Sequence, residues 1–203
     1  MGVKGAPDPA TLALAKQAEE EVNAHAKVRS VYKLFDVNVS EEGGFVELAG
    51  TGVRLEGKHL SRHLRDCRRA YLLAATLGFE MEKRVNYLMN TRPALGVATD
   101  AMCTSALECA LDDLCEDLQK QCGKKLKTRF SCGYGDFPLS AQKDMVNLLD
   151  TGRKIGVFLP ESMMLAPQKS VTAVAGVTDV PGADGGGCSA CGKSDCAFRK
   201  ENK

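Results

Sequence analysis

The stretch LGVATDAMCTSALECALDDLCEDLQKQC, residues 95–122, carries the longest single hydrophobic period in the sequence. Its apolar side chains recur every three or four residues, which is the spacing of one buried face of an α-helix. Acidic side chains come before Lys120, an order that suits the helix dipole, and Gly123 is a residue type at which helices commonly end. The pattern predicts a core helix whose buried stripe consists of Cys103, Leu107, Leu111, Leu114, Leu118 and Cys122.

Shorter patterns on both sides of this helix predict β-strands. Residues 28–39 alternate in polarity, as in a strand with one better-buried face, and 45–48 and 53–55 flank a glycine-containing turn typical of a hairpin. The apolar run at 70–76 predicts a buried strand. Further strands are expected at 126–128, 155–159 and 170–177, and further helices at 9–26, 58–66, 79–90 and 139–150. Strands in both halves with helices between them predict an α+β domain with a mainly antiparallel sheet.

Length and composition predict one domain with tails. The chain has 203 residues, of which 44% are hydrophobic, enough for one full core. We divide it into an N-terminal helix region at 1–27, the main domain at 28–180, and a glycine-rich linker with a cysteine tail at 181–203. The net charge of +1, from 27 basic and 26 acidic side chains, offers no electrostatic surface for nucleic acid or anionic lipid. Neither partner is therefore expected.

The N-terminal residues and the cysteines indicate a cytoplasmic protein. The first residues lack the apolar run of a signal peptide, and no segment approaches the roughly 20 apolar residues that span a bilayer. In a reducing compartment the nine cysteines are expected to be thiols or metal ligands rather than disulfides. Those of the long helix point in several directions around its axis, so they are expected to pack as small apolar side chains: Cys103, Cys109, Cys115 and Cys122.

Residues 129–138, Arg-Phe-Ser-Cys-Gly-Tyr-Gly-Asp-Phe-Pro, combine a cation, flexible backbone and aromatic rings. Arg129 offers a planar fork for a carboxylate or phosphate, and the glycines at 133 and 135 allow a ligand to lie against backbone amides. The Tyr134 ring can stack on a base. This composition suits a nucleoside ligand, and a tight turn leading into the next helix is the alternative interpretation.

Several ordered blocks resemble one known family. Arg129, Ser131, Gly133 and Tyr134, followed by residues 135–139 and Gln142, resemble the S-adenosylmethionine-binding signature of the activation domain of cobalamin-dependent methionine synthase. Blocks within 60–78 and 155–173 are also similar to that family, so the resemblance covers about residues 55–177. It implies a twisted antiparallel sheet flanked by helices, in a free-standing version of what is elsewhere the last domain of a large enzyme.

The resemblance implies an accessory protein that binds S-adenosylmethionine for the reductive methylation, and hence reactivation, of cob(II)alamin. Arg129 should take the methionyl carboxylate, amides around Ser131 and Gly133 should hold the methionine and adenosine portions, and Tyr134 should face the corrin. Glu161 is a weaker candidate for the ammonium or ribose, and Cys132 stands in the ligand loop where the family has proline.

Two parts of the family's system have no match in this sequence. The acidic residue that binds the ligand's ammonium in the long enzyme cannot be placed, and no Asp-x-His-x-x-Gly stretch of a cobalamin-binding module is present. The corrin is therefore expected on a separate methionine synthase or other corrinoid protein, with an electron donor as a further partner. The chain is then expected to be one component of a methyltransferase system rather than a complete enzyme.

The C-terminal tail contains a second group of candidate ligands. Cys188, Cys191 and Cys196 follow a glycine linker and can supply thiolates to zinc or an iron–sulfur cluster. The fourth ligand could be water, a residue of a partner protein or another cysteine, of which Cys132 is the candidate. A tail with adventitious cysteines is an equally weighted alternative. Two further functions stay open on this pattern: an iron–sulfur protein that donates an electron to a corrinoid protein, and a zinc-stabilised scaffold without catalytic function.

Two apparent motifs are rejected. Residues 187–194 match the phosphate-binding P-loop letter for letter, but a glycine linker precedes them where that motif needs a buried strand. His59 and His63 have the i, i+4 spacing of metal ligands, but Arg62 and Arg65 make the surroundings cationic and no third ligand lies near in sequence. We expect a solvated helix face there.

Overall fold

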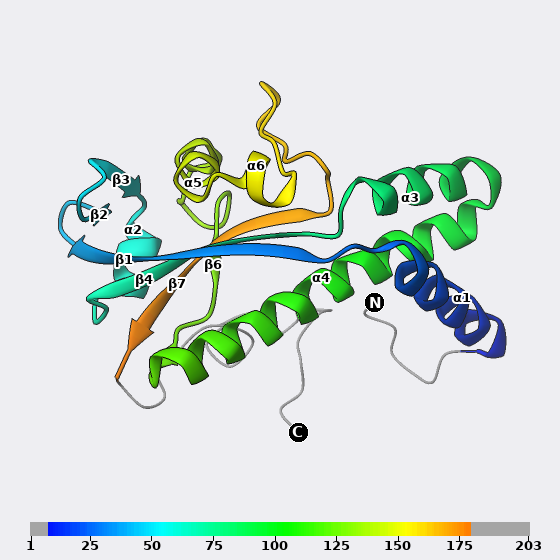
Figure 1. The fold of residues 1–203 in the computed structure, drawn as a ribbon, viewed down its shortest axis with the longest axis horizontal. Helices are drawn as coiled ribbons and strands as arrows, with labels where there is room; N and C mark the ends of the chain where they lie inside the picture. Colours follow the sequence, from blue (N-terminus) through cyan, green and yellow to red (C-terminus); the bar gives the residue numbers. More distant parts are fainter. Residues whose placement is uncertain (1–7, 180–203) are drawn as a thin grey trace.

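The computed structural model describes residues 8–179 and confirms an α+β fold built on one antiparallel sheet (Figure 1). The strand order is β3-β2-β1-β4-β7-β5, and β6 pairs with β7 along the same edge as β5. Every pairing is antiparallel, as expected. The strands are β1 (Arg29–Ser40), β2 (Phe45–Leu48), β3 (Val53–Glu56), β4 (Arg69–Thr76), β5 (Lys125–Leu126), β6 (Phe130–Ser131) and β7 (Ser170–Thr178).

Helices cover both faces of this sheet. The long helix α4 crosses one face, while α5 and α6 lie on the other (Figure 1). The helices are α1 (Pro9–His25), α2 (Lys58–Leu64), α3 (Phe79–Thr91), α4 (Pro93–Cys122), α5 (Gln142–Leu149) and α6 (Thr151–Ile155), with a 3-10 turn at Leu139–Ala141. The core helix expected at 95–122 is confirmed, and Gly123 ends it in the left-handed conformation.

The central strand β4 shows why the sheet is apolar on both faces. All its residues after Arg69 are buried. Leu72 belongs to the cluster that contains α2 and α5 side chains, whereas Leu73 packs with Leu118 of α4. A strand covered on both sides loses the polar alternation of a half-exposed strand, so β4 appears in the sequence as a continuous apolar run.

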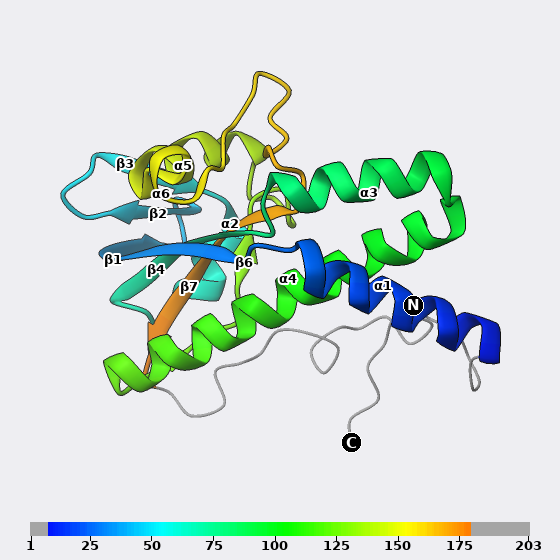
Figure 2. The ribbon, with the colours of Figure 1, turned by 45° about the vertical axis from the view of Figure 1, so that its right-hand side comes forward.

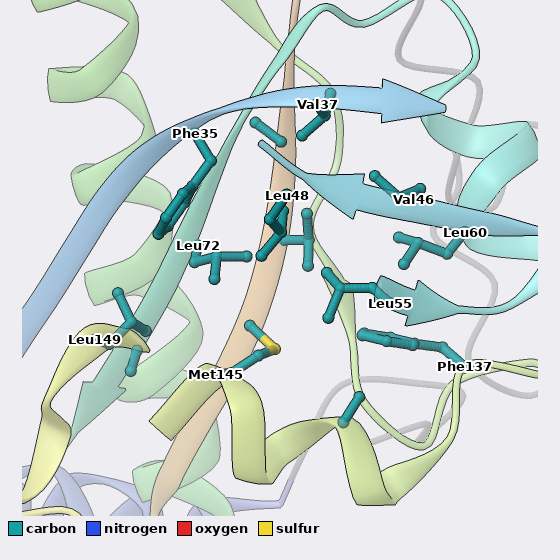
Figure 3. Close-up of a cluster of buried hydrophobic side chains, with 14 of the residues drawn as sticks. Phe35, Val37, Val46, Leu48, Leu55, Leu60, Leu72, Phe137, Met145 and Leu149 are labelled. Atoms are coloured by element: carbon teal, nitrogen blue, oxygen red, sulfur yellow. The ribbon is translucent and has the colours of Figure 1, made fainter. Parts of the chain in front are cut away.

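The largest cluster lies between the sheet, α2 and α5 (Figure 3). Leu48, Leu55, Leu72 and Met145 are fully buried there, and Phe137 inserts from the segment that precedes α5. Full burial of a side chain of this size contributes roughly 1.5–3 kcal/mol. Phe137 therefore anchors one end of the glycine-rich segment 129–138 in the core.

At the other end of the sheet, α1 and α3 pack against α4 (Figure 2). Val22 of α1 packs in one cluster with Leu107 of α4, and both guanidinium contacts from Arg84 to the Glu21 carboxylate measure 2.6 Å. By length and composition only, α4 is long and apolar enough to cross a membrane, although no such segment was expected from the sequence. Its packing against the sheet, α1 and α3 is that of a core helix.

The strand predicted at 155–159 is wrong. Ile155 is the last residue of α6, and Gly156 follows in the left-handed conformation with φ 72°. The Thr151 hydroxyl donates to the Val157 carbonyl at 2.7 Å and holds the chain in this turn. Only Phe158 forms a strand-like bridge, to Ala166. The apolar run at 155–159 reflects burial of Ile155 and Val157 in the main cluster, not sheet pairing.

Candidate functional site

The segment from β5 to β6 runs along the open edge of β7. β5 pairs with the end of β7 and β6 with its middle, and between them the Lys127 amide donates to the Gly176 carbonyl at 2.8 Å. Side chains along this edge contact opposite layers: Arg129 contacts α4, whereas Lys127 and Phe130 contact α2. The residues that the sequence grouped into one site are therefore divided between the two faces of the sheet.

Arg129 lies against α4 and pairs with two of its carboxylates. Its Nη1 lies 2.6 Å from Asp112 Oδ1 and its Nη2 lies 2.7 Å from Glu108 Oε2, while Cys115 Sγ is 3.8 Å from Nη1. The Arg129 side chain is only 16% exposed. Burial alone would lower the pKa of this guanidinium, but its hydrogen bonds to Asp112, Cys115 and Glu108 raise the pKa above the ordinary value. Arg129 therefore stays charged.

A polar ridge of α4 faces this edge of the sheet. Asp100, Thr104, Glu108 and Asp112 follow one another at four-residue spacing, which places neighbours on the same side of a helix. Lys169, just before β7, lies 3.0 Å from Asp100 Oδ1 and donates to Thr104 Oγ1 at 3.1 Å. The first two residues of the ridge thus contact Lys169 and the last two contact Arg129.

The turn after β6 uses its own amides. The Gly133 amide donates to the Phe137 carbonyl at 2.8 Å, and the Tyr134 amide donates to the Ser131 carbonyl at 3.2 Å. Open amides were expected here from the sequence, but the amides of Gly133 and Tyr134 are paired within the turn. Gly133 has φ 84°, which a glycine adopts without strain.

Tyr134 is the most exposed large side chain of the segment, at 72%. Its ring meets the Phe130 ring edge-on with 5.8 Å between centroids, so this contact orients the Tyr134 ring while most of it stays exposed to solvent.

Cys132 and Glu161 do not join Arg129. Cys132 Sγ lies 3.4 Å from Met145 Sδ, on the α5 side of the sheet, and burial raises the pKa of its thiol to about 11. That environment disfavours the thiolate that a metal requires. Glu161 is exposed in the loop between α6 and β7 and forms no ion pair within residues 8–179.

His59 and His63, which have the i, i+4 spacing of metal ligands, contact different partners. His59 Nδ1 lies 3.2 Å from the Asp136 carboxylate, and His63 Nε2 lies 2.8 Å from the Thr128 carbonyl oxygen. From residue 8 to residue 179, no group of three or more His, Cys, Asp or Glu side chains is arranged to hold a metal ion. The candidate ligands Cys188, Cys191 and Cys196, and the rejected P-loop match, lie outside the described residues.

Comparison with known proteins identifies the fold. The chain is similar to the crystal structure of the MetH reactivation domain bound to AdoHcy, with a TM-score of 0.65 and 17% sequence identity. This chain has the fold of a methionine synthase reactivation domain. The similarity covers 84% of this chain and 66% of that chain, so the chain spans just under two thirds of the reactivation domain's length. No protein-family model and no curated protein matches the sequence. The resemblance expected from the signature is thus confirmed at the level of the reactivation-domain fold.

The two carboxylates that contact Arg129 were not predicted from the sequence. Glu108 and Asp112 were interpreted only as acidic residues that suit the dipole of α4. They precede Arg129 by 21 and 17 residues. The chain reverses after Gly123, and this reversal brings Arg129 back alongside them. The four-residue spacing of Asp100, Thr104, Glu108 and Asp112 was a signal in the sequence, because such a row forms one ridge of a helix.

Proposed function

We propose that this protein binds S-adenosylmethionine between the edge segment 129–134 and α4, and presents it to a cobalamin held by another protein. The observation that carries the proposal is the coincidence of fold and signature. The fold is that of a domain whose crystal structure holds AdoHcy, and the chain carries the Arg–Ser–Gly–Tyr pattern at an exposed sheet edge.

The charges around Arg129 suit an amino acid headgroup. A methionyl group carries a carboxylate and an ammonium, and this cluster offers one cation, Arg129, with two anions, Glu108 and Asp112, at 2.7 and 2.6 Å from its guanidinium. In the proposed complex Arg129 binds the carboxylate, and one of the α4 carboxylates leaves the guanidinium to accept the ammonium. This supplies the acidic partner that sequence resemblance could not place.

The remaining parts of the reaction come from other components. Bound S-adenosylmethionine would supply a methyl group, with AdoHcy as the product, and one electron from a separate donor is needed to reduce cob(II)alamin. This chain's residues orient the ligand and exclude water, and no general base is required. The exposed Tyr134 ring is placed to meet the corrin. We expect these components to meet in the cytoplasm.

The cysteine tail stays a prediction for a metal site. Cys188, Cys191 and Cys196 are candidate thiolate ligands of an iron–sulfur cluster or zinc. Iron and zinc content after anaerobic purification tests it: a brown, iron-containing protein supports an electron-donating role, and metal-free protein removes both metal functions.

Calorimetric titration with AdoHcy and S-adenosylmethionine tests the proposed function. We expect Arg129→Gln to weaken binding by about 1.5–3 kcal/mol, which is about tenfold to 150-fold, because a hydrogen bond to a charged group is lost. Arg68→Gln is the matched control, since Arg68 is exposed, lies outside α2 and forms no ion pair among the described residues. Equal affinity in wild type and Arg129→Gln, or no binding by wild type, contradicts the proposal.

The double variant Glu108→Gln, Asp112→Asn separates headgroup recognition from a purely structural ion pair. We expect it to weaken AdoHcy binding by a similar factor. Methylthioadenosine, which lacks the amino acid group, should bind the variant and wild type alike. A variant that binds AdoHcy more tightly than wild type would mean that the two carboxylates only compete for Arg129.

A further inference from the structure

Helix α2 lacks the features that stabilise a helix by itself. It has only seven residues, and isolated helices below about 12–15 residues are marginal in water. Its N-cap is Gly57, which has no side chain to accept the free amides of the first turn. Leu60 and Leu64 are buried, so packing supports one face, but both helix ends need partners from elsewhere.

Asp136, two residues after Tyr134, supplies the partner at the N-terminal end. Its Oδ2 accepts the Lys58 amide at 2.8 Å and its Oδ1 accepts the His59 amide at 2.9 Å. A carboxylate that accepts these two amides acts as an N-cap supplied from a distant part of the chain. Consistent with this, the pKa of Asp136 is lowered, chiefly by the hydrogen bond from the His59 amide.

Lys127, two residues before Arg129, supplies the partner at the C-terminal end. Its ammonium donates to the His63 carbonyl at 2.8 Å and lies 3.4 Å from Asp66 Oδ2, with its side chain only 5% exposed. In return, the His63 ring bonds to the carbonyl of Thr128 at 2.8 Å. A buried cation on one of the last carbonyls of a helix completes the second cap.

The two caps match the helix dipole, and the loop packs closely against α2. An anion lies at the N-terminus of α2 and a cation at its C-terminus, the arrangement that stabilises a helix. A Cβ on Gly135 would lie 2.8 Å from His59 Nδ1, and a Cβ on Gly57 would lie 3.3 Å from Phe137 Cα. The segment 127–136 therefore spans α2 from end to end in direct contact with it.

We propose that α2 fixes the conformation of the segment 127–136, the ligand loop, and that Asp136 and Lys127 are positioning residues for the ligand. The inference rests on the proposed function, because Arg129 and Tyr134, the residues assigned to the ligand and the corrin, both lie between the two caps. A loop held at both ends has fewer conformations to lose when a ligand binds, so the caps raise affinity without touching the ligand. The loop and α2 should accordingly loosen or tighten together.

Hydrogen exchange of the ligand-free protein tests the coupling directly. In Asp136→Ala we expect faster exchange of amides throughout 58–64 and in 128–136, while α4 keeps its wild-type rates. Asp136→Asn should restore protection only in part, since its single amide oxygen can accept one of the two amides that the carboxylate accepts. Asp113→Ala is the matched control, because Asp113 is exposed on α4 and forms no ion pair in the described residues. Faster exchange confined to the Lys58 and His59 amides would overturn the inference.

Calorimetry with AdoHcy tests the positioning role. We expect Asp136→Ala and Lys127→Met each to weaken AdoHcy binding about five- to thirtyfold, the equivalent of losing a cap. Asp136→Asn, which keeps one of the two accepting oxygens, should lie between Asp136→Ala and wild type. A folded Asp136→Ala protein that binds AdoHcy like wild type refutes the positioning role and leaves the proposed function intact. If wild type itself does not bind AdoHcy, the proposed function and the positioning role both fail, and the exchange experiment still decides the coupling.

Should Asp136→Ala fail to fold, wild type alone remains decisive. AdoHcy should slow exchange in 58–64 as well as in the loop, although in the proposed complex α2 does not contact the ligand. Protection limited to the loop and α4 would contradict the coupling.

Discussion

Helices α4 and α2 both border the candidate site, yet they are stabilised in different ways. α4 has 30 residues, its own glycine C-cap and a buried stripe that packs against the sheet, α1 and α3. α2 has seven residues and takes both caps from the segment that it supports. The α4 side of the site is therefore stabilised by its own cap and core packing, whereas α2 depends on its contacts with the ligand loop. A ligand bound at this edge is thus expected to reduce the mobility of α2 more than that of α4.

The largest effect is expected from the scaffold side. Leu111 of α4 is 1% exposed, and Leu111→Ala should lower the free energy of unfolding by about 2–5 kcal/mol because it removes a buried side chain and leaves a cavity. Urea denaturation followed by circular dichroism measures this loss. Since α4 supports the whole fold, exchange should rise across the sheet as well as in α4. A loss below about 1 kcal/mol would show that α4 is not the main support.

A smaller effect should be confined to the α2 side. Gly135→Ala places a Cβ 2.8 Å from His59 Nδ1 at φ 60°, so we expect it to destabilise the protein by more than the roughly 1–2 kcal/mol that a left-handed conformation alone costs. Gly52→Ala is the control, because Gly52 has φ 72° and nothing within 4 Å of the added atom. The difference between the two unfolding free energies measures the contact between loop and α2, and equal losses would count against that contact.

The smallest effect expected is a pH dependence of protein stability that arises from His63, where α2 contacts the loop. Burial, with the positive charge of Lys127 adding to it, lowers the pKa of His63 below the ordinary 6.5. The unfolded chain therefore binds a proton at His63 before the folded protein does, and stability should fall gradually as pH drops below about 6.5. His63→Gln, which keeps a donor for the Thr128 carbonyl, should flatten this part of the profile in urea titrations between pH 7.5 and 5.5. An unchanged slope would assign the dependence to other groups.

Much of the fold was predictable because it follows from periodicity. The long period of α4, the hairpin of β2 and β3 and the apolar run of β4 each reflect one face or two faces of burial within a short stretch. The strand expected at 155–159 failed because Ile155 is buried from the end of α6 and Val157 from the turn that follows it, not from a strand. β6 was not predicted, since two residues are too few to show a period.

The site was predictable only in part, because its contacts join segments far apart in sequence. The signature located the loop, but nothing local to Arg129 specified that its guanidinium lies against Glu108 and Asp112. The pairing of Asp136 with α2 spans 77 and 78 residues, and a pattern within one segment cannot show it. The metal prediction for the tail concerns residues beyond position 179 and keeps its status as a prediction.

The exposed ring of Tyr134 has a practical use. The chain contains no tryptophan and four tyrosines, so its intrinsic ultraviolet emission arises from few groups; Tyr71 is buried, and Tyr134 is the most exposed of the other three. A chromophore that approaches Tyr134, such as a corrin, should quench part of this emission, and the quenching should be smaller in Tyr134→Leu. Association with a coloured partner can thus be followed in the unlabelled protein, and the difference between wild type and Tyr134→Leu gives the part that arises at Tyr134.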